Sequence, residues 1–336
     1  MIQEAVKKVV EGIHLTRDEA RAAMETIMNG EATEAQIGGF LVAMRFKGET
    51  VEEISSFTRV MREKATRIDA GAADVLDTCG TGGDGARTFN ISTIAAFVAA
   101  GAGAVVAKHG NRSVSSRCGS ADVLMELGVR IDIPPEQVSG CLREIGIGFL
   151  FAPKLHASMK YAIGPRRELG IRTFFNILGP MTNPAGAKRQ LLGVYDESLV
   201  ETVAGVLADL GSECAFVVHG SDGLDEITTT GDTAVAEVRD GGVRMYRIGP
   251  EQFGIPRARS VDLEGGDPVL NAEIFRSVLS GAAGPRRDIV LINSAFAVCA
   301  AGKASTPEDG LALAARSIDS GAAMGKYLKL VEYTNA

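Results

Sequence analysis

A glycine-rich segment, DTCGTGGD at residues 77–84, has the composition of a phosphate-binding turn. It follows an apolar strand at Val75 and Leu76 and precedes a helix that we expect to begin near Asn90. Glycine lets backbone N–H groups approach an anion, and a helix that begins with a capping Asn, Ser or Thr directs its partial positive charge at a phosphate. The segment therefore predicts a polyphosphate site. A glycine turn without a ligand is the alternative.

A second segment, KHGNRSVSS at residues 108–116, follows the apolar strand 104–107. Lysine, arginine, an amide and three hydroxyls can all donate hydrogen bonds to anionic oxygens. Gly119 and Ser120 then open another helix, which makes a second unit of strand, loop and helix. We expect this cluster to hold a diphosphate. A solvated basic loop is the alternative, and it would explain Lys108 or Arg112 taken singly.

An acidic segment, DGLDE at residues 222–226, follows a predicted strand at 214–218. Adjacent carboxylates repel each other, and a hard cation between them and a substrate removes that repulsion. Magnesium typically takes one or two carboxylates together with phosphate and water oxygens, and Asp225 and Glu226 supply that minimum. An acidic turn is the better reading of the segment alone, but two phosphate loops beside it favour a metal site.

A fourth region, residues 165–184, places cationic side chains beside aromatic and apolar ones. This mixture suits an aromatic carboxylate, because a guanidinium can grip the carboxylate while an apolar wall receives the ring. Spacing alone does not choose among Arg166, Arg167 and Arg172, and each of them taken singly fits an ordinary surface arginine.

The elements that position these motifs divide into a helical part and an α/β part. Residues 1–68 predict four short helices, with capping boxes that begin at Thr16, Thr33 and Thr50. Residues 69–336 alternate short apolar strands with helices, which predicts a larger domain with a mostly parallel central sheet flanked by helices. Residues 154–175 read as helical and would join the first part, which makes the small domain discontinuous.

Two further expectations concern the ends of these domains. Residues 228–248 predict a hairpin at the rim of the sheet, and four helices at about 271–279, 286–301, 307–319 and 322–333 would cover the sheet. In the N-terminal part, Phe40, Leu41, Met44 and Phe46 give apolar surface to share with another domain or subunit, and dimerisation through it is a hypothesis.

Composition excludes several classes of protein. The chain is 46% hydrophobic and 23% charged, as in globular proteins, and its net charge of -7 argues against a surface that binds nucleic acid or membranes through bulk charge. Five scattered cysteines signal neither zinc nor a disulfide framework. The first residues lack the apolar run of a signal peptide, and the apolar stretch 94–107 is too short to span a bilayer. We therefore expect a cytoplasmic protein.

Together, the four motifs in this order resemble the anthranilate phosphoribosyltransferase family, from the N-terminal helices to the last ones. The resemblance implies the fold of pyrimidine nucleoside phosphorylases and phosphoribosyltransferases, with an active site in the cleft between the small helical domain and the α/β domain. It implies homodimers through the helical domain, dependence on Mg²⁺, and transfer of the phosphoribosyl group of phosphoribosyl pyrophosphate to anthranilate in tryptophan biosynthesis.

The resemblance also assigns residues. It places phosphoribosyl pyrophosphate on Gly80, Gly83, Asp84, Thr88, Asn90, Ile91, Ser92, Thr93, Lys108, His109, Gly110, Asn111, Arg112, Ser113, Val114, Ser115, Ser116 and Ser120. It places magnesium on Ser92, Asp225 and Glu226, and anthranilate on Gly80, Asn111 and Arg166, with His109 and His156 along its path. Local variations are Arg117 and Cys118 in the tail of the phosphate loop, and Pro165 before Arg166.

The chemistry implied by the resemblance relies on charge and position. Loss of pyrophosphate leaves an oxocarbenium-like centre, so stabilising the leaving group lowers the barrier most. The amine of anthranilate is neutral at working pH, and we assign no catalytic base. A pyrimidine nucleoside phosphorylase is the nearest alternative, but it would not need the Asp225 and Glu226 pair. A non-catalytic paralogue that binds nucleotides or nucleic acid is the alternative from another class.

Overall fold

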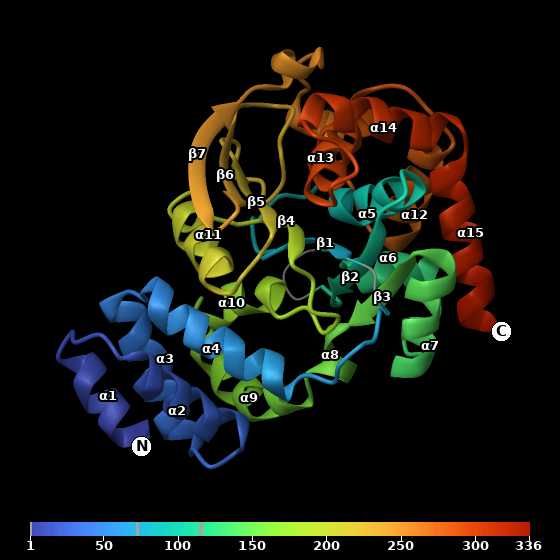
Figure 1. The fold of residues 1–336 in the computed structure, drawn as a ribbon. Helices are drawn as coiled ribbons and strands as arrows, with labels where there is room; N and C mark the ends of the chain where they lie inside the picture. Colours follow the sequence, from blue (N-terminus) through green and yellow to red (C-terminus); the bar gives the residue numbers. More distant parts are fainter. Residues whose placement is uncertain (1, 72–73, 114–116) are drawn as a thin grey trace.

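A seven-stranded sheet forms the centre of the computed structural model, which describes residues 2–71, 74–113 and 117–336 (Figure 1). The strand order is β3-β2-β1-β4-β5-β6-β7, in which the first five strands run parallel and the last two antiparallel. The strands are β1 (Val75–Gly80), β2 (Val105–Gly110), β3 (Ile147–Phe151), β4 (Arg189–Gly193), β5 (Cys214–Gly220), β6 (Thr233–Arg239) and β7 (Gly242–Ile248). The predicted fold class, with a mostly parallel sheet and a hairpin at its rim, is confirmed.

Two helical layers cover the two faces of this sheet. Side chains of β5 alternate between two cores: Phe216 and Val218 enter one, and Ala215 and Val217 enter the other. Parallel sheets are usually buried on both faces in this way. The helices of the first core are α5 (Ile91–Gly101), α6 (Ser120–Glu126), α7 (Pro135–Gly140), α12 (Pro268–Leu279), α13 (Pro285–Ala300), α14 (Pro307–Asp319) and α15 (Ala322–Asn335). The last four confirm the predicted C-terminal helices.

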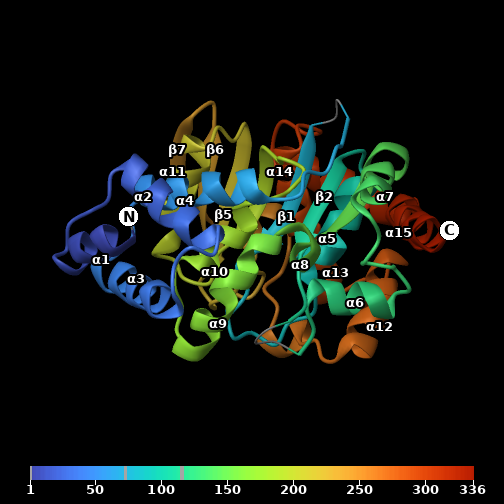
Figure 2. The same cartoon turned by 90° about the horizontal axis from the view of Figure 1, so that it is seen from below.

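The N-terminal helices belong to the second core, and Figure 2 shows them on the opposite side of the molecule from α12 and α15. They are α1 (Ile2–Val10), α2 (Arg17–Met28), α3 (Glu34–Lys47) and α4 (Val51–Lys64), and they are joined by α9 (Lys160–Leu169), α10 (Phe175–Leu178) and α11 (Leu199–Asp209). The short helix α8 (Ala152–Leu155) instead contributes Leu155 to the first core. All three predicted capping boxes are present, at Thr16, Thr33 and Thr50. No helix of the described ranges is long and apolar enough to cross a membrane.

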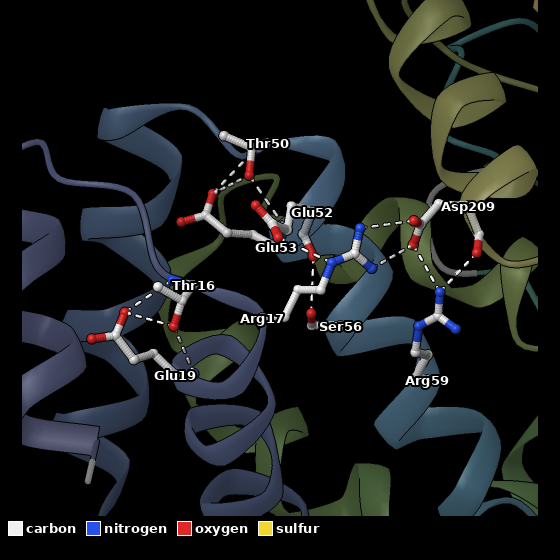
Figure 3. A network of polar contacts seen from close by, with 9 residues as sticks. All are labelled: Thr16, Arg17, Glu19, Thr50, Glu52, Glu53, Ser56, Arg59 and Asp209. Carbon is white, nitrogen blue, oxygen red and sulfur yellow. Dashed lines mark hydrogen bonds and ion pairs between the residues drawn. The ribbon is translucent and has the colours of Figure 1, made fainter.

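An ionic contact ties the N-terminal helices to α11 (Figure 3). Asp209, at the end of α11, accepts hydrogen bonds from Arg17 of α2 at 2.8 and 3.0 Å and from Arg59 of α4 at 2.8 Å. The hydrogen bond from Arg17 is the main reason that the pKa of Asp209 lies far below its usual value. This carboxylate is therefore held ionised between two cations.

The segment 154–175 is only partly helical, which corrects the expectation. Gly170 adopts a left-handed conformation (φ 61°) that ends α9, and residues 170–174 form no helix. As expected, α9 packs against α2 and α3, and the ring of Phe174 lies 4.6 Å from that of Phe57 in α4. The boundary at residue 68 and the discontinuous small domain stay predictions.

The apolar side chains expected to share surface behave differently from one another. Phe40, Leu41 and Met44 are buried, and the Phe40 ring makes edge contacts with Phe57 and Phe174. Phe46, by contrast, is 94% exposed. Three of the four thus belong to the second core within the chain, because α3 packs against α1 and α9 on that side.

Candidate functional site

The polar motifs meet at the carboxyl ends of β1, β2, β4 and β5. The sheet order reverses between β1 and β4, since β2 and β3 lie on one side of β1 while β4 and β5 lie on the other. In open α/β sheets, ligands bind at such a reversal, outside the carboxyl ends of the strands. The topology therefore selects the same edge of the sheet that the sequence motifs occupy.

Two of the strands extend further into the motifs than the sequence indicated. Strand β1 continues through Gly80 and β2 through Gly110, so Asp77 and Lys108 lie inside strands rather than in loops. Lys108 is only 3% exposed. The expectation of a loop beginning at these residues is wrong, because partners elsewhere in the chain satisfy these polar side chains inside the sheet.

The acidic turn is wedged against the ends of β1 and β4. A Cβ atom on Gly80 would lie 2.2 Å from Oδ2 of Asp225, and one on Gly193 would lie 1.6 Å from its carbonyl oxygen. Gly193 therefore excludes any side chain, and a side chain at Gly80 would displace the carboxylate of Asp225. The backbone N–H of Gly82 donates to Oδ2 of Asp225 at 2.8 Å, which joins the glycine-rich segment directly to the turn.

Glu226 is joined to the start of α5 and to the buried lysine. The N–H of Ser92, in the first turn of α5, donates to Oε1 of Glu226 at 3.0 Å. Lys108 Nζ donates to the hydroxyl of Ser92 at 3.4 Å and to the carbonyl of Thr78. Burial lowers the pKa of Lys108, while Asp77 and the two carboxylates of the turn oppose that shift. One cation thus lies among several acids.

Burial and mutual repulsion destabilise the ionised form of the carboxylates at this site. Burial raises the pKa of Asp84 to about 7 and that of Glu226 to about 8, and repulsion from Asp225 adds to both. Burial also raises the pKa of Asp225 itself. A hard cation would relieve this repulsion. Within the described ranges, no group of three or more His, Cys, Asp and Glu could hold a metal alone, so ligand oxygens would have to complete its coordination.

Asn90, just before α5, bonds to Cys118 beyond the second loop and to α12 instead of capping α5. Its side chain makes no capping hydrogen bond, which corrects the expectation of a capping Asn. Its Nδ2 donates to the carbonyl of Cys118 at 3.0 Å, and its Oδ1 accepts from Asn271 Nδ2 at 2.9 Å. Tertiary partners thus outcompete the local cap, and they tie the start of α5 to the segment that follows the second loop.

The second loop is described only in part. Ser120 donates to the carbonyl of Asn111 at 3.3 Å, and the N–H of Ser113 donates to Asp122 at 3.0 Å. Arg112 is exposed, and its guanidinium contacts the sulfur of Met125. Three predicted residues lie outside the described ranges: Val114, Ser115 and Ser116.

Three other predicted residues surround the beginning of α5. Thr88 pairs with Glu264 in an isolated antiparallel bridge, and the N–H of Ile91 donates to the carbonyl of Phe89 at 2.8 Å. The hydroxyl of Thr93 is buried and has no hydrogen-bond partner among the described residues. Thr93 thus places a buried hydroxyl without a hydrogen-bond partner in the first turn of α5.

His109 and His156 form a buried pair of imidazoles, with their Nε2 atoms 3.2 Å apart. Burial lowers the pKa of His109 to about 3 and that of His156 to about 4, so both rings are neutral. The backbone N–H of His109 is held by Asp77, whose other oxygen accepts from Asn183 at 2.8 Å. Asp77 and Asn183 were not assigned from the sequence, although both lie in the quoted motifs.

The arginines of the fourth motif separate into different environments. Arg166 stacks on the ring of Phe175 at 5.1 Å, burial lowers its pKa, and no carboxylate in the described chain pairs with it. Arg172 donates to the carbonyl of Gly83 and stacks on Tyr195 at 4.0 Å. Thus Arg166 keeps an unpaired guanidinium beside an aromatic wall, while Arg172 fastens the glycine-rich segment. Tyr195 was missed, since its partner lies 23 positions earlier in the chain.

Comparison with known proteins covers nearly the whole chain. Residues 3–65 match the helical bundle domain of a glycosyl transferase family, and residues 72–324 match the a/b domain of that family. An anthranilate phosphoribosyltransferase of Moorella thermoacetica is 58% identical over 336 residues, which is 100% of this chain and 99% of the relative.

Solved structures agree with this match. The anthranilate phosphoribosyltransferase of Thermus thermophilus has a TM-score of 0.94 and 42% identity, and the match covers 99% of both chains. The Saccharomyces cerevisiae enzyme, solved in complex with PRPP and Mg, has a TM-score of 0.91 and 28% identity, with 99% of this chain and 98% of that chain covered. This chain therefore belongs to the anthranilate phosphoribosyltransferase family.

Proposed function

We propose that the chain transfers the 5-phosphoribosyl group of phosphoribosyl pyrophosphate to the amine of anthranilate, which gives N-(5-phosphoribosyl)anthranilate and pyrophosphate in tryptophan biosynthesis. The observation that carries this function is the contact of the acidic turn with both the glycine-rich segment and the start of α5. A nucleoside phosphorylase would not need that pair of carboxylates. The intact acidic turn likewise disfavours a non-catalytic paralogue.

The donor would lie at the carboxyl edge of the sheet, across the first turn of α5. The N–H groups of Thr81 and Gly82 are engaged by Gly193 and Asp225, so the following N–H groups of the glycine-rich segment, Lys108 and the hydroxyls of the second loop would surround the diphosphate. The unpartnered hydroxyl of Thr93 supports this position, because a buried hydroxyl normally has a hydrogen-bond partner. Charged donors at the leaving group stabilise the negative charge that develops as the C1–O bond breaks.

The residues present fit a magnesium ion. Asp225 and Glu226 lie side by side, their pKa values are raised, and the hydroxyl of Ser92 is nearby. We propose that these three residues hold the ion, with Asp84 beside them and diphosphate oxygens completing the coordination. When bound, Mg²⁺ supplies positive charge to the departing diphosphate. The protein's part is to hold the two carboxylates beside the glycine-rich segment and the start of α5.

Anthranilate would bind between Arg166 and the neutral histidine pair. The guanidinium of Arg166 can take the carboxylate, and Phe175 offers an apolar wall. We propose that Asn111 and Gly80 contact anthranilate from the side of the donor. Neither His109 nor His156 is a strong base, because their pKa values are about 3 and about 4. This supports catalysis through position and charge, without a dedicated base.

The assembly and the location of the protein also stay proposals. We propose a homodimer through the helical part, because Val42, Phe46 and Ile163 expose apolar side chains on the neighbouring helices α3 and α9. We propose a cytoplasmic enzyme, in line with its five free cysteines and its biosynthetic reaction.

Anthranilate fluorescence tests the function directly. Adding phosphoribosyl pyrophosphate and Mg²⁺ to the protein with anthranilate should abolish the fluorescence of anthranilate over time, and omitting Mg²⁺ should prevent the loss. Phosphorolysis of thymidine or uridine by inorganic phosphate, with anthranilate unchanged, would instead establish the nucleoside phosphorylase alternative.

A further inference from the structure

A buried asparagine holds the acidic turn from the side opposite the glycine-rich segment. Asn293 lies in the middle of α13 and has no exposed surface. Its Nδ2 donates to the carbonyl of Ile227 at 2.8 Å, and its Oδ1 accepts from the N–H of Ile227 at 2.9 Å. Ile227 directly follows Glu226. One side chain therefore satisfies both backbone polar groups of the residue next to the carboxylates.

Only one orientation of this amide fits its surroundings. Nδ2 also donates to the carbonyl of Ile289, one turn earlier in α13, at 2.8 Å. Two carbonyls thus require the nitrogen, and one N–H requires the oxygen. Ile227 is itself fully buried, so water does not replace these bonds. Without Asn293, the backbone of Ile227 would have to turn to find other partners.

A rotation of the backbone at Ile227 would also move the carboxylates of Asp225 and Glu226, which directly precede it. The N–H of Ser92 meets Glu226 from α5, and Asp225 is wedged against Gly193, so small rotations break both arrangements. The two hydrogen bonds from Asn293 to Ile227 anchor this backbone from outside the reacting groups.

We propose that Asn293 is a positioning residue for the cation site: by holding both backbone groups of Ile227, it keeps Asp225 and Glu226 turned toward the glycine-rich segment. This inference rests on the proposed function, in which these carboxylates hold Mg²⁺. Residues that orient metal ligands from behind commonly change metal affinity when they are replaced.

The variant Asn293→Thr separates the bond that Asn293 makes within α13, to Ile289, from its two bonds to Ile227. A threonine hydroxyl in a helix can donate to the carbonyl four residues earlier, as Thr26 does to Ala22 at 2.8 Å and Thr58 to Ile54 at 2.7 Å. The variant thus keeps a bond to Ile289 and loses both bonds to Ile227. The variant Ser317→Ala is the control, since it removes a buried hydrogen bond to Val98 that joins α14 to α5.

The primary readout is binding of Mn²⁺, measured by electron paramagnetic resonance with phosphoribosyl pyrophosphate present. We expect N293T to raise the dissociation constant of Mn²⁺ roughly tenfold or more. In the fluorescence assay, the Mg²⁺ concentration that gives half-maximal rate should rise to a similar extent. KM for anthranilate should stay within about twofold, because the variant leaves the residues proposed to bind anthranilate unchanged. S317A should change none of these values. Unchanged Mn²⁺ binding in folded N293T would overturn the role of Asn293.

Two further variants keep the result interpretable. The double variant D225N/E226Q should abolish Mn²⁺ binding; if it binds Mn²⁺ normally, the metal assignment fails, and the inference fails with it. If D225N/E226Q loses the ion while N293T retains it, only the role of Asn293 is overturned. Should N293T not fold, as judged by circular dichroism, Asn293→Ser carries the same hydroxyl in a smaller volume and must give the expected loss of affinity.

Discussion

Two groups of carboxylates in this molecule have opposite electrostatic states. At the contact between α11 and the N-terminal helices, Asp209 lies between Arg17 and Arg59, and its pKa is held far below the usual value (Figure 3). At the carboxyl edge of the sheet, Asp225 and Glu226 lie side by side and their pKa values are raised. The first group is complete within the protein. The second has one buried lysine among several carboxylates, and such a cluster with raised pKa values marks a candidate site for a charged ligand.

The largest expected effect removes the charge of the second group. D225N/E226Q should reduce turnover by about a hundredfold or more, because positive charge at the leaving group is lost with the ion that these carboxylates hold. Initial rates of anthranilate fluorescence loss at saturating Mg²⁺ measure this. An unchanged, magnesium-dependent rate would show that the ion binds elsewhere.

A second variant tests the acceptor side of the same edge. Arg166→Ala should raise KM for anthranilate roughly tenfold to a hundredfold, because a hydrogen bond to a charged group contributes about 1.5 to 3 kcal/mol. KM for phosphoribosyl pyrophosphate should change little. Arg167→Ala is the matched control on the same helix, and equal effects on both substrates in R166A would contradict the assignment.

The pH dependence of stability should distinguish the two groups. A raised folded-state pKa means that Glu226 contributes stability fully below its unfolded pKa near 4.5 and loses it as pH rises through about 8. Glu226→Gln should therefore stabilise the metal-free protein at pH 9 relative to the unchanged chain, by roughly 1 to 3 kcal/mol, and far less at pH 5. Urea unfolding at both values measures this, and a pH-independent difference would exclude the shift.

The smallest expected effect is on stability, at the ion pairs of Asp209 with Arg17 and Arg59. Asp209→Asn should lower the free energy of unfolding by about 1 kcal/mol at neutral pH, since partly exposed ion pairs are weak even in a network. The lowered pKa means that this contribution is present above pH 3.8 and is lost as pH falls below it. Turnover per folded molecule should stay the same. A large loss of turnover in D209N would mean that the two groups are not independent.

The sequence predicted the elements that local rules determine. The capping boxes of α2, α3 and α4, the turn of the β6–β7 hairpin and the C-terminal helices depend on neighbouring residues, and they were predicted correctly. The ends of β1 and β2 were not, because Asp77 and Lys108 resemble loop residues until their distant partners are known. A charged residue inside a parallel strand is visible only in the fold.

The sequence predicted residues of the candidate site, but not the hydrogen bonds that join them. Motif spacing placed glycines, a lysine and two carboxylates at strand ends, and the fold brings them into contact. Nothing local indicates that Asn90 bonds to Asn271, or that Asn293 holds Ile227, because these partners are separated by 181 and 66 residues. Choosing Arg166 over its neighbours required the family resemblance, and the unpaired guanidinium beside Phe175 is consistent with that choice.

The most direct test of this account is a crystal grown with phosphoribosyl pyrophosphate and Mn²⁺, examined by anomalous scattering at the manganese edge. The account predicts an anomalous peak beside Asp225 and Glu226, with the diphosphate over the first turn of α5. A diphosphate bound at that turn with its Mn²⁺ peak away from both carboxylates, or a ligand bound at another edge of the sheet, would contradict it.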